Sequence, residues 1–150
     1  MTESTGDTMI LNTLIATTID SINGYRESAE EVESPRLREL FTKRATERSA
    51  VVEQLRGEVS RLGGNPEDDG TILAAGHRAF LNLKAAVVSR DDKAVLNEVE
   101  RGEDYLKTKY EAALNDGKLA PQSRTLVETA FASVRAGHDE MSALKHSMEA

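Results

Sequence analysis

Apolar residues recur every three or four positions along almost all of this 150-residue chain. That spacing places them on one face of an α-helix. The strict alternation of apolar and polar residues that marks a half-buried β-strand is absent. The pattern therefore predicts an all-α protein with a single domain over residues 8–150, preceded by a flexible arm over residues 1–7.

Residues that begin or end helices divide the pattern into five segments. Ser34 can accept a backbone hydrogen bond at a helix start, and Pro35 fits the first turn that follows. Glycine tolerates the left-handed conformation in which many helices end. The predicted helices cover about 8–33, 35–62, 71–89, 92–115 and 121–148, with Gly63-Gly64, Asp91-Asp92, Gly117 and Pro121 at their ends.

The lengths of these segments favour a four-helix bundle. Helices of about 25 residues are roughly 37 Å long, and the shorter helix over 71–89 spans roughly 28 Å. The shorter helix can therefore return the chain along the outside, so that the second and fourth predicted helices run parallel. That up-down-down-up order is the ferritin-like arrangement, here with an extra helix in the long crossover.

Composition narrows the classes of function. Acidic residues number 26 and basic residues 19, so the formal net charge is −7. This balance argues against nucleic-acid and anionic-membrane partners, which both select positive surfaces. The chain has no cysteine, which excludes disulfides and thiolate sites. The N-terminus resembles no signal peptide and no apolar stretch approaches the roughly 20 residues of a membrane helix, so we expect a cytoplasmic protein.

Several polar residues occupy positions on the predicted apolar stripes. Counted along the proposed topology, those on the first, second, fourth and fifth predicted helices lie within about two helical turns of one another, at mid-bundle. The interpretation that we favour is a buried salt-bridge and hydrogen-bond network that fixes helix register. Its predicted members are Tyr25, Arg44, Arg48, Glu103, Tyr110 and His138.

Mid-bundle is also where carboxylate-bridged di-iron proteins build their site, with Glu-x-x-His motifs on two helices. Here Arg135 stands three residues before His138, so the motif is absent there. Two alternatives stay open. One is a degenerate iron or manganese site on Glu100, Glu103 and His138, which requires Arg44 and Arg48 to point away; the other is a small-ligand pocket at the same level.

Motifs spread along the chain resemble those of a bacterial ferritin-like family of four-helix-bundle proteins with no assigned function. The resemblance covers residues 10–148 and implies the fold but no activity. Phe80 departs from the family, which more often has Gly-Trp after the alanine. The matching motifs are Leu11-Asn12, Gly24-Tyr25-Arg26, Arg44 with Arg48, Leu62-Gly63-Gly64, Gly76-His77-Arg78-Ala79-Phe80, Glu100-Arg101-Gly102-Glu103-Asp104, Tyr110 and His138-Asp139.

The sequence thus predicts a non-enzymatic bundle with a structural, regulatory or stress-related binding role. A metal-dependent oxidoreductase and a small-ligand binder are the alternatives. Apolar residues beyond the predicted core stripes would cover a partner helix, which favours a homodimer. These residues are Ile10, Ile19, Val51 and Val88.

Overall fold

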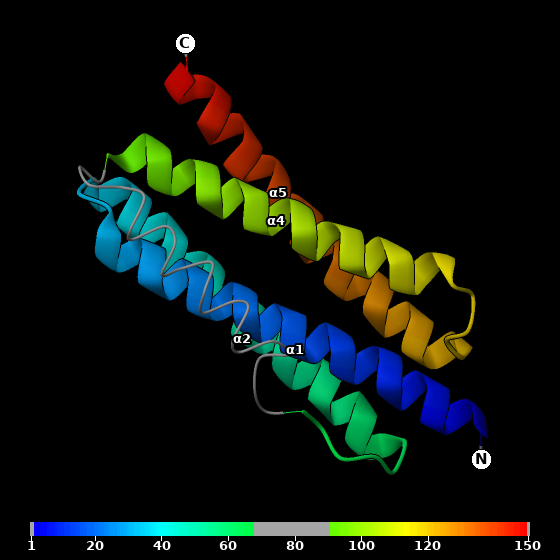
Figure 1. The fold of residues 1–150 in the computed structure, drawn as a ribbon. Helices are drawn as coiled ribbons and strands as arrows, with labels where there is room; N and C mark the ends of the chain where they lie inside the picture. Colours follow the sequence, from blue (N-terminus) through cyan, green and yellow to red (C-terminus); the bar gives the residue numbers. More distant parts are fainter. Residues whose placement is uncertain (1, 68–90, 150) are drawn as a thin grey trace.

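The computed structural model of the protein describes residues 2–67 and 91–149. Within these residues the chain forms four α-helices and no strand (Figure 1). They are α1 (Thr2–Glu31), α2 (Pro35–Arg61), α4 (Asp92–Asn115) and α5 (Pro121–Glu149). The all-α prediction is confirmed for this part of the chain, and the predicted helix over 71–89 lies outside it.

Most predicted helix ends are confirmed, with the expected local chemistry. The Ser34 hydroxyl accepts a hydrogen bond from the Leu37 backbone N–H at the start of α2. The Asp91 carboxylate accepts one from Ala94 at the start of α4. Gly63 and Gly117, which follow α2 and α4, have φ angles of 85° and 73°, a conformation that glycine adopts without strain.

The start of the first helix differs from the prediction. Helix α1 begins at Thr2 rather than near residue 8, so the segment predicted as an arm is helical from its second residue. The side chain of Asp7 is buried, and its carboxylate accepts a hydrogen bond of 3.0 Å from the Ala120 backbone N–H. This contact ties Asp7, one residue before the predicted helix start, to the residue before α5.

Contacts between helix ends fix the directions of the four helices. Asp7, near the start of α1, meets Ala120, just before α5, so these two helices start at the same end. Asp92, at the start of α4, accepts hydrogen bonds from the backbone N–H groups of Glu33 and Ser34 in the turn between α1 and α2. Helices α2 and α4 therefore both start at the opposite end and run in the same direction (Figure 1).

The four helices share one apolar core. The residues spaced three or four apart along α1 and the turn after it are all buried, namely Leu11, Leu14, Ile15, Thr18, Ile22, Tyr25, Ala29 and Val32. Burying a Leu, Val or Phe side chain contributes roughly 1.5–3 kcal/mol, so such a core supplies most of the stability. Core side chains with no exposed area include Leu11, Ile15, Phe41, Leu55, Leu96, Val127, Val134 and Met141.

The first half of α1 contacts the segment that follows α2. The Asn12 side chain donates to the Asn65 carbonyl and accepts from the Glu67 backbone N–H. A Cβ on Gly64 would lie 2.6 Å from Thr8 Cγ2. The chain after α2 therefore passes so close to α1 that any side chain at position 64 would force the Thr8 side chain to move.

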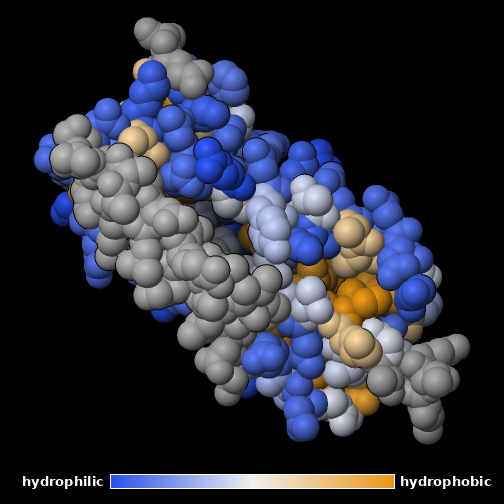
Figure 2. All heavy atoms as spheres, in the orientation of Figure 1, coloured by the Kyte–Doolittle hydropathy of each residue, from blue (hydrophilic) through white to orange (hydrophobic). Residues whose placement is uncertain are grey.

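Much of the surface is hydrophilic, and apolar atoms gather where the N-terminal half of α1 meets the C-terminal half of α4 (Figure 2). Among the residues predicted for a dimer face, Ile10 and Ile19 are partly exposed. Val51 is 5% exposed and belongs to the core, which corrects its predicted surface position; Val88 lies outside the described residues. No helix in the described part of the chain is long and apolar enough to span a membrane.

Candidate functional site

A buried ion pair lies at the middle of the bundle. Arg48 Nη1 and Nη2 of α2 donate to Glu103 Oε1 and Oε2 of α4 over 2.8 and 2.6 Å, a bidentate contact. Arg48 Nη1 also donates to the Ser21 hydroxyl of α1 over 2.7 Å. The two charged side chains are 0% and 2% exposed. Removing such charges from water costs several kcal/mol per ion, which only well-aligned pairing offsets.

The ring of Tyr25 covers the guanidinium on another side. The carbon Cζ of Arg48 lies 5.6 Å from the centre of the Tyr25 ring, within cation–π range. The Tyr25 ring in turn lies 5.8 Å from that of Phe41. The Tyr25 hydroxyl is buried and forms no hydrogen bond of normal geometry within the described part of the chain. Burial, reinforced by the negative charge of Glu103, raises the pKa of Tyr25 well above its ordinary value.

Helix α5 covers the ion pair with its backbone. Gly137 is buried, and a Cβ built on it would lie 2.5 Å from Arg48 Nη2 and 3.0 Å from Glu103 Oε2. All four helices therefore contribute to one level of the bundle. We call this level the mid-bundle polar layer, comprising Ser21, Tyr25, Arg48, Glu103 and Gly137.

Tyr110 makes a separate buried contact. Its hydroxyl and that of Thr18 share a hydrogen bond of 2.8 Å. Thr18 also donates to the Leu14 carbonyl, so Tyr110 acts as the donor to Thr18. Burial raises the pKa of Tyr110 to about 12, so the hydroxyl keeps its proton near neutral pH.

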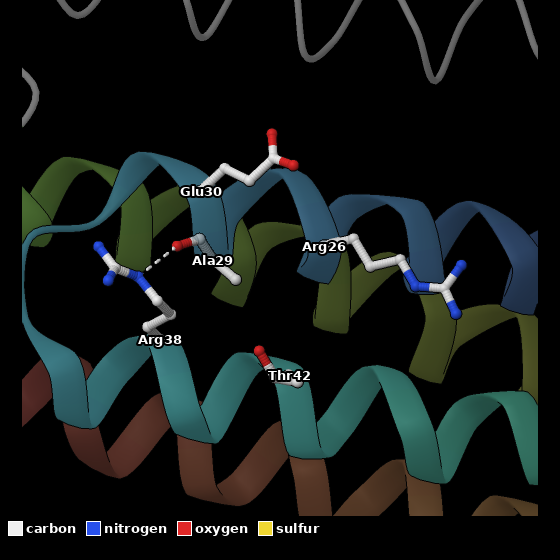
Figure 3. Close-up of a pocket in the computed structure, with 5 residues that line it drawn as sticks. All are labelled: Arg26, Ala29, Glu30, Arg38 and Thr42. Atoms are coloured by element: carbon white, nitrogen blue, oxygen red, sulfur yellow. Dashed lines mark hydrogen bonds between the residues drawn. The ribbon is translucent and has the colours of Figure 1, made fainter.

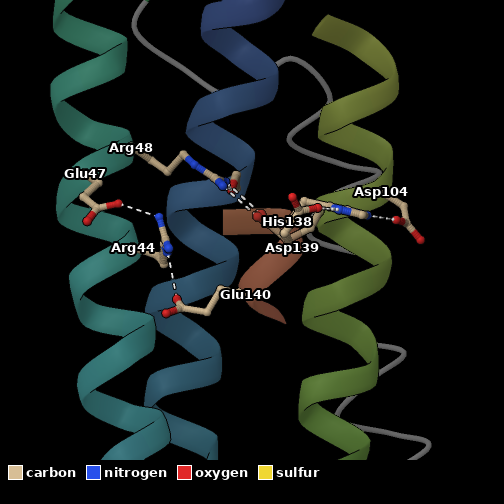
Figure 4. Close-up of polar contacts among 9 residues, drawn as sticks. Arg44, Glu47, Arg48, Asp104, His138, Asp139 and Glu140 are labelled. Carbon is tan, nitrogen blue, oxygen red and sulfur yellow. Dashed lines mark hydrogen bonds and ion pairs between the residues drawn. The ribbon is translucent and has the colours of Figure 1, made fainter. Parts of the chain in front are cut away.

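The other two predicted network residues lie outside the layer (Figure 4). Arg44 turns toward α5, where its Nε donates to Glu140 over 3.0 Å and its Nη1 to Glu47 over 2.7 Å. His138 lies between Asp104 of α4 and Asp139, with nitrogen–oxygen distances of 2.5 and 3.1 Å. The structure thus divides the six predicted network residues among several contacts.

The three candidate metal ligands are not brought together. Glu103 is paired with Arg48, Glu100 lies 3.4 Å from Lys145 Nζ, and the two nitrogens of His138 face different carboxylates. No group of three His, Asp or Glu side chains within residues 2–67 and 91–149 could hold a metal ion. These donors do not fit an iron or manganese centre, and their metal role stays a prediction.

Sequence reasoning missed Ser21, Asp104 and Gly137. Ser21 carried a signal, because it precedes Tyr25 by four residues and so shares its helix face. Asp104 directly follows Glu103, and its pairing with His138 depends on how α4 and α5 are rotated against each other. Gly137 differs from an ordinary helix-interior glycine only in what packs on it, which the sequence does not state.

An open groove of about 530 Å³ lies between α1 and α2 (Figure 3). Arg38 lines this groove, and its guanidinium donates hydrogen bonds to the backbone carbonyls of Ala29 and Val32 at the end of α1. A cation there satisfies free carbonyls and complements the helix dipole. Arg38 therefore has a structural role, and Arg26, Glu30 and Thr42 complete the lining.

The position of His138 predicts a pH dependence of stability. Burial lowers its pKa, but hydrogen bonds to Asp139 and Asp104 outweigh this and raise it above the ordinary 6.5, against the opposing charge of Lys107. A raised folded-state pKa adds stability below about 6.5, which is lost as pH rises through the folded value. Urea denaturation at several pH values should show this loss in the wild type and not in His138→Gln; parallel curves would contradict it.

The comparisons with known proteins give a family. No curated protein matches the chain. The model of the family described as Domain of unknown function (DUF2383) matches residues 8–116, which include most of α1 and all of α2 and α4. Helix α5, which carries Gly137 and His138, follows the matched range. Because the match covers well over half of the residues, the chain belongs to this family of domains of unknown function, DUF2383.

Proposed function

We propose that this chain is a ferritin-like bundle that acts by binding a partner rather than by catalysis. Two features support the fold: α2 and α4 run in the same direction, and the segment that joins them is long enough to return along the bundle. The observation that carries the functional proposal is the bidentate Arg48–Glu103 pair at mid-bundle.

The Arg48 guanidinium is a single positive charge paired with Glu103 at mid-bundle, the level at which a di-iron bundle holds its metal ions. The guanidinium lies where a cation would have to bind, and it engages both oxygens of Glu103. A metal ion there would have to displace Arg48 from a site with no exposed area and leave its charge unpaired. The pair thus makes the layer a structural element, and a binding role falls to the outer faces of the helices.

A structural, regulatory or stress-related binding role is consistent with that arrangement. The partly exposed Ile10 and Ile19 of α1 make a second copy of the chain one candidate partner. The strongly exposed Met9 adds apolar surface on the same helix.

Metal retention tests the proposal. The chain is incubated anaerobically with ferrous, manganous or zinc ions, desalted and examined by elemental analysis. We expect well under one metal ion per chain. Near-stoichiometric metal that is lost in both Glu103→Gln and His138→Asn would overturn the proposal and favour the oxidoreductase alternative. His146→Ala is the matched control, because His146 is exposed and lies in α5 beyond the polar layer, toward the C-terminal end of the helix.

A further inference from the structure

Gly137 stands in the interior of the 29-residue helix α5, where glycine is a poor helix former. Alanine would be favoured at this position by backbone entropy alone. The site is buried, and the atoms that a Cβ would meet are the charged ends of Arg48 and Glu103. The missing side chain therefore has a specific consequence for the polar layer.

We propose that Gly137 is a positioning residue that seats α5 directly on the Arg48–Glu103 pair and thereby holds all four helices in register. The contact distance of 2.5 Å to Arg48 Nη2 is too short for any real Cβ. An exposed arginine would simply move aside. Here Nη2 is bound to Glu103 over 2.6 Å, Nη1 is bound to Ser21, and the whole side chain is buried, so the guanidinium could move aside only by breaking these contacts.

The same close approach seals the layer from water. Helix α5 lies over Glu103 Oε2, which strengthens an ion pair that depends on a low local dielectric. A larger residue at position 137 would push α5 outward or displace one partner of the pair. The proposal concerns helix packing in the metal-free chain and is tested by melting temperature rather than by metal retention, so its failure and that of the proposed function are distinguishable.

A pair of glycine substitutions tests this role. Gly102 lies in the interior of α4, next to Glu103, but is exposed and has no atom within 4 Å of an added Cβ. Gly102→Ala should therefore keep or raise the melting temperature, because alanine favours the helix. Gly137→Ala should lower it by about 5 °C or more, a large shift for a chain of this size. An equal rise in both variants would contradict the proposal.

A second background separates positioning from general crowding. In Arg48→Met/Glu103→Leu, the atoms that a Cβ at position 137 would strike are gone. Adding Gly137→Ala there should change the melting temperature by less than about 2 °C. If Gly137→Ala fails to fold alone, the same background should restore folding. An equal loss in both backgrounds, or no rescue, would overturn the proposal.

Discussion

Replacing Glu103 with alanine should lower the free energy of unfolding by about 3–5 kcal/mol. The substitution leaves the Arg48 guanidinium, which has no exposed area, with Ser21 as its remaining side-chain acceptor within the described residues. A buried charge without a counter-ion retains its desolvation cost and loses the attraction that offset it. Urea denaturation of the wild type and of Glu103→Ala measures the difference. The free energy of unfolding is calculated from the midpoint urea concentration and the slope m, and m should be the same in both proteins.

Two controls make the Glu103 result specific. Glu140 also pairs with an arginine, but its side chain is 34% exposed, so Glu140→Ala should cost less than about 1 kcal/mol. The double substitution Arg48→Met/Glu103→Leu removes both charges and should cost far less than Glu103→Ala. If Glu103→Ala cost no more than Glu140→Ala, the pair would not be buried as described.

Replacing Phe41 with alanine should cost about 3–5 kcal/mol, the usual range for a buried aromatic residue. Phe41 is 0% exposed, and its ring lies 5.8 Å from that of Tyr25. The cavity would remove support from the ring that covers Arg48, so the loss should include part of the cation–π contact. Chemical denaturation provides the measurement.

Met9→Ala is the matched control for Phe41→Ala. Met9 is 68% exposed, and substitutions at such positions usually change stability by no more than about 0.5 kcal/mol. A Phe41→Ala loss below about 1 kcal/mol would mean that the core adjusts around the gap and that Tyr25 is held by other contacts. A double-mutant cycle of Phe41→Ala with Tyr25→Leu, which removes the second ring, would then show no coupling.

Together these variants separate two roles of the bundle centre. The apolar shell, represented by Phe41, supplies stability through burial. The ion pair costs desolvation and gains attraction, so its net contribution to stability is small although breaking it is expensive. Its benefit is specificity: a bidentate contact holds α2 and α4 at one relative height, and Gly137 extends that register to α5.

Sequence patterns alone were enough to predict helices α1, α2, α4 and α5 and most of the residues that they bury. Helix periodicity and end signals act within a few residues, so Ser34, Asp91 and the glycines after α2 and α4 could be placed without knowing the fold. The burial of Asp7 near the start of α1 was missed because its partner, Ala120, is 113 positions away. Local patterns contain no information about such a partner.

Which polar residues contact one another depends on the packing of the helices. Arg44 and Arg48 share a helix face, four residues apart, yet Arg48 enters the core and Arg44 turns toward Glu140. Glu103 and His138 were predicted at one level, yet His138 faces Asp104 instead. A hydrogen bond requires its two atoms within about 3 Å, whereas helix periodicity places a side chain only to within a turn of about 5.4 Å. The rotation and spacing of packed helices therefore set these pairings, and with them the charge at the bundle centre.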